Sequence, residues 1–365
     1  MHAFFVSRKK AHAVWLRVSK HYIWVRMNPA RLVFCGGGTR CLVFMQALIA
    51  LEKAQRLQHV REYWGTSAGA LLAALLALGK SPARVKSVMW AADYTKFRNL
   101  DVSNMLGIMS TWGLDDGKSL TGEIERLFEI MEPGSKTKKL RDVSGLHIIV
   151  SDLNIHDTVD VNAQTFPDLR VVDAIRASMS LPIFFRPFVC PANGHFWVDG
   201  AVRAHFPWHV LPNDDARNSA LGFSFEKSWD GGPKSFTEYI FSMIHFDEPK
   251  AIRNLKQKWP RNIMWFPSPP YPAWFVRLRE EDYSLVESMG QATYDSWIRS
   301  LGDSGCPPKT TGIQKDYARP CIPGPSSPVN HTTELLDSPR ASPRPSQDSS
   351  PPQLPHKPLS RRWTI

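Results

Sequence analysis

Cysteine is scarce in this 365-residue chain: there are only five, an odd number, and none is spaced as a zinc site or a disulfide framework. The chain also lacks the uncharged run of about 20 apolar residues that a transmembrane helix needs. Basic residues interrupt the apolar stretches of residues 1–28, so no signal-peptide core is expected there. We therefore expect an intracellular, cytoplasmic protein in a reducing compartment.

Acidic residues are absent from residues 1–31, which carry seven Lys and Arg. The net charge of the chain is +11, but residues 32–249 contribute −2, with 22 basic and 24 acidic residues. Residues 250–301 and 302–365 contribute +3 each, with eight basic and five acidic residues in both. A basic charge confined to the flanks disfavours a nucleic-acid partner. It favours peripheral contact with an anionic membrane surface or a lipid droplet.

Composition divides the chain into four segments. Residues 1–30 form a basic, aromatic extension, for which a membrane-surface helix and an ordinary peripheral segment both remain open. Residues 31–212 have the apolar patterning of a main domain, and residues 213–301 are expected to pack on or near it. The aromatic and basic stretch 260–279 within the latter is either a membrane-facing loop or a coil that covers the core. Residues 302–365 are rich in Pro and Ser and predict a disordered tail.

A strand, a glycine turn and a helix open the main domain. Residues 31–35 predict the strand, Gly36, Gly37 and Gly38 the turn, and residues 42–56 the helix. Consecutive glycines can present backbone N–H groups to an anion. A Walker phosphate loop does not fit because no Gly-Lys-Ser/Thr follows, and a dinucleotide fingerprint lacks its third spaced glycine. The interpretation that remains is a donor loop for an oxyanion.

The pattern Gly-x-Ser-x-Gly occupies Gly65 to Gly69 and is followed by the apolar run 70–78, which predicts a buried helix. In a nucleophile elbow, small residues flank a serine on a sharp strand-to-helix turn, as Gly65 and Gly69 flank Ser67. The helix N-terminus favours negative charge on a reacting oxygen. Taken alone, the pattern fits a Gly/Ser turn that caps a buried helix equally well.

Asp199 ends a short predicted strand immediately before Gly200, a location where α/β sheets carry site residues. The order of strands and helices before it predicts an α/β fold with a parallel sheet. A polar cluster formed by Asp152, His156, Asp157 and Asp160 is interpreted as a turn and strand ends rather than as metal ligands. No metal site is expected.

In this order, the three motifs resemble those of the patatin-like lipid acyl hydrolases. The matching stretches are Gly36-Gly37-Gly38-Thr39-Arg40, Gly65-Thr66-Ser67-Ala68-Gly69 and Asp199-Gly200-Ala201, with supporting stretches at 113–117, 174–182 and 206–207. The resemblance covers about residues 31–212, which would be the catalytic domain. It implies a three-layer α/β/α fold with a mainly parallel central sheet and a nucleophile elbow. Cys41 stands where the family usually has glycine, and a bulkier turn there could tighten the donor loop.

The resemblance further implies a Ser–Asp dyad that hydrolyses lipid carboxylic esters through an acyl-enzyme, as a phospholipase A or an acylglycerol lipase does. Ser67 would attack the ester carbonyl, and Asp199 would accept its proton and later activate water. The family's oxyanion hole falls on the turn Gly36 to Gly38, where Arg40 would position the loop or pair with a lipid phosphate. No cofactor is implied. Burial that raised the pKa of Asp199 would make it a better base.

Three alternatives remain open from the sequence. Because His195, His205 and His209 lie close to Asp199 in the chain, a conventional Ser–His–Asp triad in a soluble esterase is one of them. The second is a weakly active or inactive scaffold that binds membrane lipid or a partner through the basic flanks. The third is a soluble serine esterase unrelated to lipid. Unless a triad forms, the three histidines are interpreted as strand-end or turn residues. The sequence indicates neither the preferred lipid nor the oligomeric state.

Overall fold

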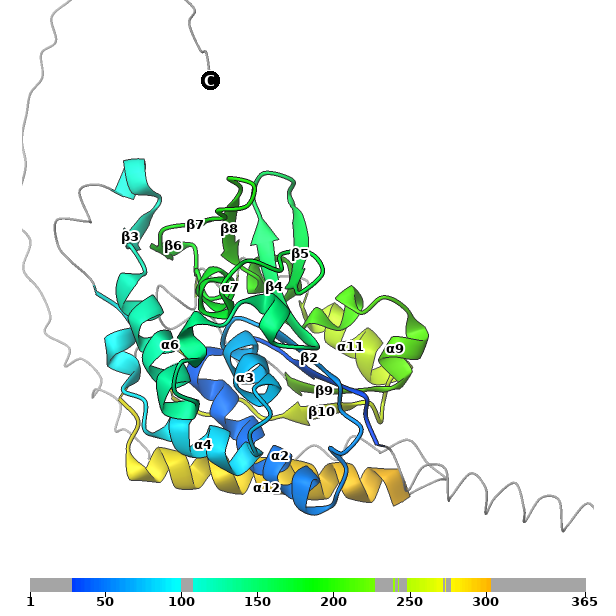
Figure 1. Cartoon of the computed structure of the whole chain (residues 1–365). Helices are drawn as coiled ribbons and strands as arrows, with labels where there is room; N and C mark the ends of the chain where they lie inside the picture. The colour runs from blue at the N-terminus through cyan, green and yellow to red at the C-terminus, as the bar shows by residue number, and fades with distance from the viewer. Residues whose placement is uncertain are drawn as a thin grey trace, which may run out of the picture. The chain divides into compact units, whose positions relative to one another are not determined.

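The computed structural model describes residues 28–99, 108–226, 239, 242, 248–271, 273 and 277–302 (Figure 1). The chain divides into the units Met1–Lys309 and Thr310–Ile365, and every described residue belongs to the first. The expected N-terminal extension, except for its last three residues, and the expected tail, except for Gly302, lie outside the described residues.

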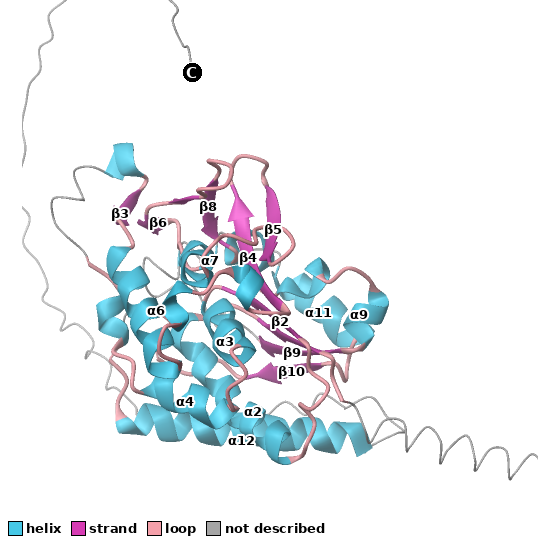
Figure 2. Ribbon diagram, viewed as in Figure 1, coloured by secondary structure: helices cyan, strands magenta, loops and turns pink. Residues whose placement is uncertain are grey.

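A central sheet of eight strands organises the described part of the chain (Figure 2). Its order is β10-β9-β1-β2-β4-β8-β7, and β5 also pairs with β4. Strands β10, β9, β1, β2 and β4 are mutually parallel, whereas β5 and β8 run antiparallel to β4. The strands are β1 (Arg31–Phe34), β2 (Glu62–Thr66), β4 (Leu146–Asp152), β5 (Asp157–Asn162), β7 (Phe188–Val189), β8 (Phe196–Asp199), β9 (Ala220–Phe225) and β10 (Ile263–Phe266), with a separate pair β3 (Gly113–Asp115) and β6 (Ile183–Phe185). The mainly parallel sheet that the sequence predicts is confirmed.

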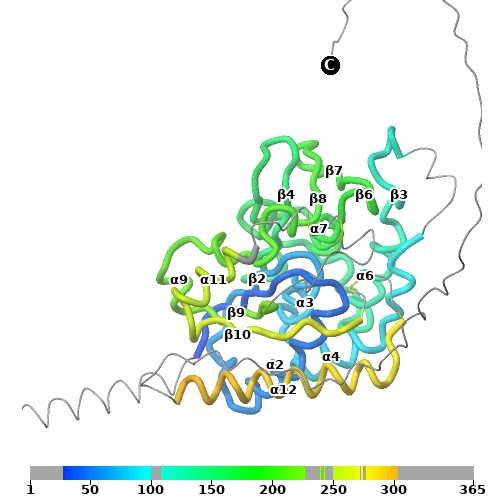
Figure 3. The backbone as a smooth tube through the Cα atoms, turned by 180° about the vertical axis from the view of Figure 1, so that it is seen from behind, coloured from blue at the N-terminus to red at the C-terminus, as the bar shows by residue number. Residues whose placement is uncertain are grey.

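Helices cover both faces of this sheet. One face carries α2 (Phe44–Lys53), α3 (Ala68–Ala77), α4 (Pro82–Trp90), α6 (Lys118–Met131), α7 (Val171–Ser178) and α12 (Glu280–Gly302); the other carries α8 (Ala201–Ala204), α9 (Asp214–Asn218) and α11 (Glu248–Lys258). Figure 3 shows α9 and α11 from behind. Strand β1 alternates between the two cores: Leu32 and Phe34 pack in the larger one, and Val33 joins Trp64 in the smaller. The three-layer α/β/α fold is therefore confirmed.

The expected helix 42–56 begins differently in the structure. A 3₁₀ turn, η1 (Gly38–Val43), precedes α2, which then ends at Lys53. Helix α3 is apolar all round, and nine of its ten residues are buried, because it lies between the sheet and the other helices of its layer. None of the described helices combines the length and the apolar character that crossing a bilayer requires.

The sheet continues beyond residue 212. Residues 220–223 of strand β9 pair with the whole of β1, and β10 pairs with β9. In the aromatic and basic stretch 260–279, Ile263–Phe266 is thus a strand of the central sheet, neither a membrane-facing loop nor a coil. The apolar run of β10 is short and is flanked by prolines and basic residues, so the sequence pattern does not predict a strand there. Helix α12 then packs on α2, where Gln46 Nε2 donates to Gln291 Oε1 over 3.2 Å.

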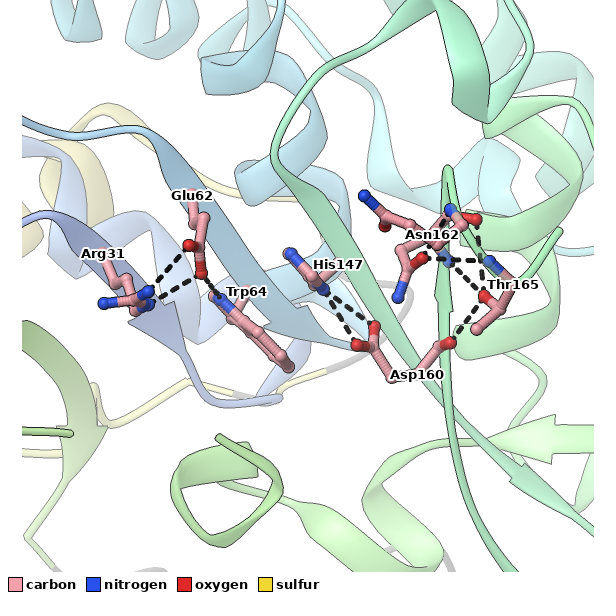
Figure 4. A network of polar contacts seen from close by, with 8 residues as sticks. Arg31, Glu62, Trp64, His147, Asp160, Asn162 and Thr165 are labelled. Atoms are coloured by element: carbon pink, nitrogen blue, oxygen red, sulfur yellow. Dashed lines mark hydrogen bonds and ion pairs between the residues drawn. The ribbon is translucent and has the colours of Figure 1, made fainter. Parts of the chain in front are cut away.

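A row of paired side chains ties neighbouring strands together on the face that carries α9 and α11 (Figure 4). Arg31 Nε lies 2.7 Å from Glu62 Oε2, which also accepts from Trp64 Nε1 over 3.1 Å. The Trp64 ring stacks on His147 with centroids 3.8 Å apart, and His147 Nδ1 lies 2.9 Å from Asp160 Oδ2. This row links β1, β2, β4 and β5, so Asp160 serves the packing of the sheet.

Candidate active site

Two strands that meet end to end create the site. Strand β2 runs parallel to β4 and finishes with Thr66 opposite Ile149. Strand β8 runs antiparallel to β4 and finishes with Asp199 opposite Val150. Because β5 occupies the other edge of β4 along the same residues, β2 and β8 must share one edge. The residue that follows β2, Ser67, is thereby directed at the side chain that ends β8.

Ser67 occupies a strained turn between β2 and α3. Its φ of 55° and ψ of −126° form a combination that non-glycine residues rarely adopt. The turn is tight because a Cβ on Gly65 would lie 2.3 Å from the Gly69 carbonyl oxygen, and one on Gly69 would lie 2.4 Å from that of Cys35. These approaches explain both glycines of the motif and confirm the nucleophile elbow.

The Ser67 hydroxyl donates directly to the Asp199 carboxylate, with 2.7 Å between Oγ and Oδ2. The other carboxylate oxygen, Oδ1, accepts the Ala201 N–H over 2.8 Å. Both side chains are buried, Ser67 at 1% and Asp199 at 0% exposure. Burial raises the pKa of Asp199 to about 7, against the opposing effects of these two hydrogen bonds and of His205. Near neutral pH, the carboxylate can therefore both accept and release a proton.

Ser178, at the end of α7, supports the elbow from behind. Its Oγ accepts the Ser67 N–H over 2.8 Å and donates to the Ile149 carbonyl over 2.6 Å, and its own carbonyl accepts the Gly200 N–H over 3.3 Å. No role is predicted for Ser178 from the sequence, although it lies in the stretch 174–182 that supports the family resemblance. Only the folded arrangement brings this serine to the turn 111 residues away.

We predict that Ser178→Ala lowers the free energy of unfolding by about 1–3 kcal/mol, because the buried Ser67 N–H loses this acceptor. Urea unfolding measures the change. Ser87→Ala is the matched control: the Ser87 hydroxyl donates to the Arg84 carbonyl on an exposed helical turn, and its loss should cost less than about 0.5 kcal/mol. Equal losses in the two variants would contradict the supporting role.

The glycine turn lies against Ser67. A Cβ on Gly36 would lie 3.3 Å from the Ser67 Cβ, so the turn passes directly beside the elbow. The Gly36 N–H already donates to the His205 carbonyl over 2.9 Å. Of the three N–H groups expected to bind an oxyanion, that of Gly36 is therefore already used. Those of Gly37 and Gly38 donate to no other described residue.

Arg40 and Cys41 follow in η1, and their side chains make different contacts. Arg40 Nε donates to the Tyr271 carbonyl over 3.0 Å, an interaction that holds the turn in place. Cys41 is fully buried, and its Sγ lies 3.6 Å from the Cys35 carbonyl oxygen. Burial raises the pKa of this thiol well above its ordinary value, so it stays protonated and acts as a small apolar side chain under the turn.

The three histidines near Asp199 in the chain separate in the fold. His195 Nδ1 lies 2.7 Å from the buried Asp152, which also accepts from Trp197 Nε1 over 2.9 Å. His209 is exposed. Only the His205 ring approaches the site: its Cδ2 would lie 3.3 Å from a Cβ on Gly36. Among the described residues, no group of three or more His, Cys, Asp or Glu side chains could hold a metal ion.

An apolar cavity of about 490 Å³, including space open to solvent, lies next to Ser67. Gly38 of the glycine turn and Ala68, the residue after Ser67, both line it. Its walls are otherwise almost entirely apolar or aromatic, and they comprise Thr39, Leu71, Met89, Tyr94, Phe97, Leu120, Met179, Phe185 and Ala273. A flexible apolar chain would fit next to Ser67.

Comparison with known proteins agrees with the sequence motifs. The family model "Patatin-like phospholipase" matches residues 32–212. Probable lipid hydrolase 463L of Invertebrate iridescent virus 6 is 24% identical over 180 residues, 48% of this chain and 61% of that protein. The chain therefore spans about three fifths of the viral relative. Uncharacterized protein YqhO of Bacillus subtilis (strain 168) is 26% identical over 293 residues, 73% of this chain and 97% of that protein.

Solved structures show weaker likeness. VipD from Legionella pneumophila has a TM-score of 0.48 and 14% identity, over 75% of this chain and 67% of that one. ExoU of Pseudomonas aeruginosa, in complex with SpcU, has a TM-score of 0.43 and 19% identity, over 76% of this chain and 53% of that one. Through the match over residues 32–212, which contains the elbow and the aspartate that it contacts, the chain belongs to the patatin-like phospholipase family.

Proposed function

We propose that this protein is a lipid acyl hydrolase that cleaves carboxylic esters with a Ser67–Asp199 dyad. The observation that carries the proposal is the 2.7 Å contact between the Ser67 hydroxyl and the buried Asp199 carboxylate at a nucleophile elbow. Family membership supports a lipid substrate, as does the similarity to the probable lipid hydrolase of the virus. The preferred lipid class, phospholipid or acylglycerol, is the part that needs measurement.

In the first half of the reaction, Asp199 accepts the Ser67 proton while Oγ attacks the ester carbonyl. The tetrahedral intermediate collapses, the alcohol leaves with the proton that Asp199 carried, and an acyl-enzyme remains. In the second half, Asp199 takes a proton from water, which attacks the acyl-enzyme. Asp199 then returns that proton to Ser67 Oγ as the fatty acid leaves. A carboxylate of ordinary pKa is a weak base for a hydroxyl, and the raised pKa of Asp199 reduces that mismatch.

Oxyanion stabilisation falls to the N–H groups of Gly37 and Gly38 in this proposal. Both glycines have positive φ, and their turn passes beside Ser67. Removing one such donor in comparable enzymes costs about 2.7–4 kcal/mol of transition-state stabilisation. Arg40 would then act by fixing the turn through its contact with Tyr271, which we favour over direct pairing with a lipid phosphate.

The apolar cavity is the proposed acyl-chain site because it is lined both by Gly38, one of the proposed oxyanion donors, and by Ala68, the residue after Ser67. We predict that kcat/KM for p-nitrophenyl esters rises steeply with acyl length, by about fourfold per added methylene until the cavity is filled. The factor follows from about 0.8 kcal/mol for each buried methylene. The measurement is a series of initial rates from acetate to dodecanoate, corrected for hydrolysis without protein.

Each alternative gives a different outcome in that series. A soluble esterase would hydrolyse the shortest esters as well as the long ones. A lipid-binding scaffold would hydrolyse none of them, and the hydrolase proposal would then be wrong. A Ser–His–Asp triad is not favoured, because the Ser67 hydroxyl donates directly to Asp199, whereas a triad places a histidine between the two side chains.

We also propose a peripheral, cytoplasmic location on an anionic lipid surface. The three described cysteines, Cys35, Cys41 and Cys190, are free and buried, as in proteins of reducing compartments. Helix α11 adds exposed basic residues to those of the flanks, among them Lys250, Arg253 and Lys258. Basic side chains near a membrane each contribute about 1 kcal/mol of attraction to anionic lipid.

A further inference from the structure

The turn that carries the proposed oxyanion donors is held by residues outside the family-matched range 32–212. The Thr39 N–H donates to the Ala273 carbonyl over 2.8 Å, and the Thr39 hydroxyl donates to the same oxygen over 3.1 Å. The Tyr271 carbonyl accepts from Arg40 Nε over 3.0 Å. The Tyr271 hydroxyl, in return, donates to the Thr39 carbonyl over 3.3 Å. Tyr271 and Ala273 thus bind the residues that immediately follow Gly37 and Gly38.

Tyr271 is suited to a fixed structural contact rather than to chemistry. It is 7% exposed, and its ring packs in the larger core. Burial raises the pKa of its hydroxyl far above the ordinary value of 10, so the hydroxyl remains a hydrogen-bond donor throughout the working pH range. The contact with Thr39 therefore does not change with pH.

The turn is also confined from the side of strand β9. A Cβ on Gly37 would lie 2.6 Å from Cε2 of Phe225, so the Phe225 ring lies directly against the turn. Phe225 and Tyr271 both lie beyond residue 212 and belong to the segment that extends the sheet. The position of the Gly37 and Gly38 N–H groups is thus set from two directions by this C-terminal segment.

We propose that Tyr271 is a positioning residue for the oxyanion turn, and that the segment after β10 is a working part of the active site. Tyr271 acts through the Thr39 carbonyl, two residues or fewer from both donor N–H groups, and does not itself touch the substrate. An oxyanion donor must lie about 2.7–3.1 Å from the charge that develops in the transition state, and a displacement of 1 Å can cost 100-fold in rate. This inference rests on the proposed hydrolase function.

The test compares Tyr271→Phe with Tyr283→Phe. Each variant removes one tyrosine hydroxyl that donates to a backbone carbonyl, that of Thr39 in the glycine turn in the first case and that of Trp90 in α4 in the second. We expect kcat of Tyr271→Phe on a long-chain ester to fall about tenfold, with KM within twofold of wild type. Tyr283→Phe should keep wild-type kcat and show a similar change in melting temperature.

A second readout is the inhibition constant of a long-chain trifluoromethyl ketone, which forms a hemiketal oxyanion on the serine. Tyr271→Phe should weaken this inhibitor about tenfold and leave the corresponding alcohol unaffected, a selective change that a loss of general stability does not produce. Should Tyr271→Phe fail to fold, Thr39→Val serves instead, because it removes the hydroxyl contact with Ala273 and keeps the backbone one. A fall of about threefold in both readouts is expected for it.

The outcomes separate this inference from the function on which it rests. If wild type hydrolyses the ester but Tyr271→Phe matches Tyr283→Phe in kcat and in ketone inhibition, the positioning role is wrong and the hydrolase proposal stands. If wild type neither hydrolyses the ester nor binds the ketone, the hydrolase proposal is wrong, and the positioning role falls with it.

Discussion

Replacement of Ser67 by alanine is expected to lower kcat for lipid ester hydrolysis by about 10⁴-fold or more, because the acyl-enzyme can no longer form. A long-chain fluorophosphonate probe should label the wild-type protein at Ser67 and leave the variant unlabelled. Ser300→Ala is the control: its hydroxyl donates only to the Trp297 carbonyl within α12, and this variant should be labelled and active like wild type. Wild-type activity in Ser67→Ala would exclude Ser67 as the nucleophile.

A glycine at the same position separates chemistry from strain. Ser67→Gly should be as inactive as Ser67→Ala, yet more stable than it by about 1–2 kcal/mol in urea unfolding. Glycine adopts a φ of 55° with a ψ of −126° readily, whereas any residue with a Cβ is strained there. Equal stability of the two variants would show that the elbow stores no backbone strain.

The sequence was sufficient to predict the sheet, the elbow and the chain positions of Ser67 and Asp199, because each depends on short-range signals. The strand predicted over residues 31–35 is observed as β1 over Arg31–Phe34, since a short apolar run that ends at consecutive glycines admits few other structures. Asp199 was found because it ends an apolar strand at a Gly turn. The contact between Ser67 and Asp199 requires β2 and β8 to share an edge of β4, which no local pattern specifies.

The supporting residues were beyond prediction for the same physical reason. Ser178 lies 111 residues from the N–H group that it accepts, and Tyr271 lies 232 residues from the carbonyl that it contacts. Serine and tyrosine occur in many roles, so their identity alone carries little information. The family resemblance ends near residue 212, although the sheet continues through β9 and β10 and the glycine turn is contacted by Tyr271.

Asp199→Asn is expected to lower kcat by about 10⁴-fold, because the amide keeps the shape of the carboxylate but cannot accept the Ser67 proton. In wild type, the base must be ionised, so kcat/KM should rise with pH and level off above the Asp199 pKa of about 7. A pH–rate profile between pH 5 and 9 measures this. A midpoint near pH 4 would contradict a base whose carboxylate is buried, and an unchanged rate in Asp199→Asn would exclude it as the base.

Asp199→Asn should also stabilise the fold in the pH range in which wild type is active. Between pH 4 and 7, the unfolded chain has released the Asp199 proton while the folded chain still holds it, so the wild-type free energy of unfolding falls as pH rises. The difference between the ordinary pKa of 3.8 and about 7 corresponds to about 4 kcal/mol, at about 1.4 kcal/mol per pH unit. Asp199→Asn does not titrate, so it should be more stable than wild type by up to about that amount at pH 8 and no more stable at pH 3.

Asp168→Asn provides a control of opposite sign. Asp168 is exposed, and hydrogen bonding to Lys139, together with the charge of Arg141, lowers its pKa. Its ionised form therefore favours the folded state above its unfolded pKa, and the substitution should give no gain in stability at pH 8. Urea unfolding of both variants at pH 3, 5 and 8 decides the matter. Only a gain that grows with pH in Asp199→Asn, and is absent in Asp168→Asn, agrees with a buried carboxylate kept ready for proton transfer rather than for stability.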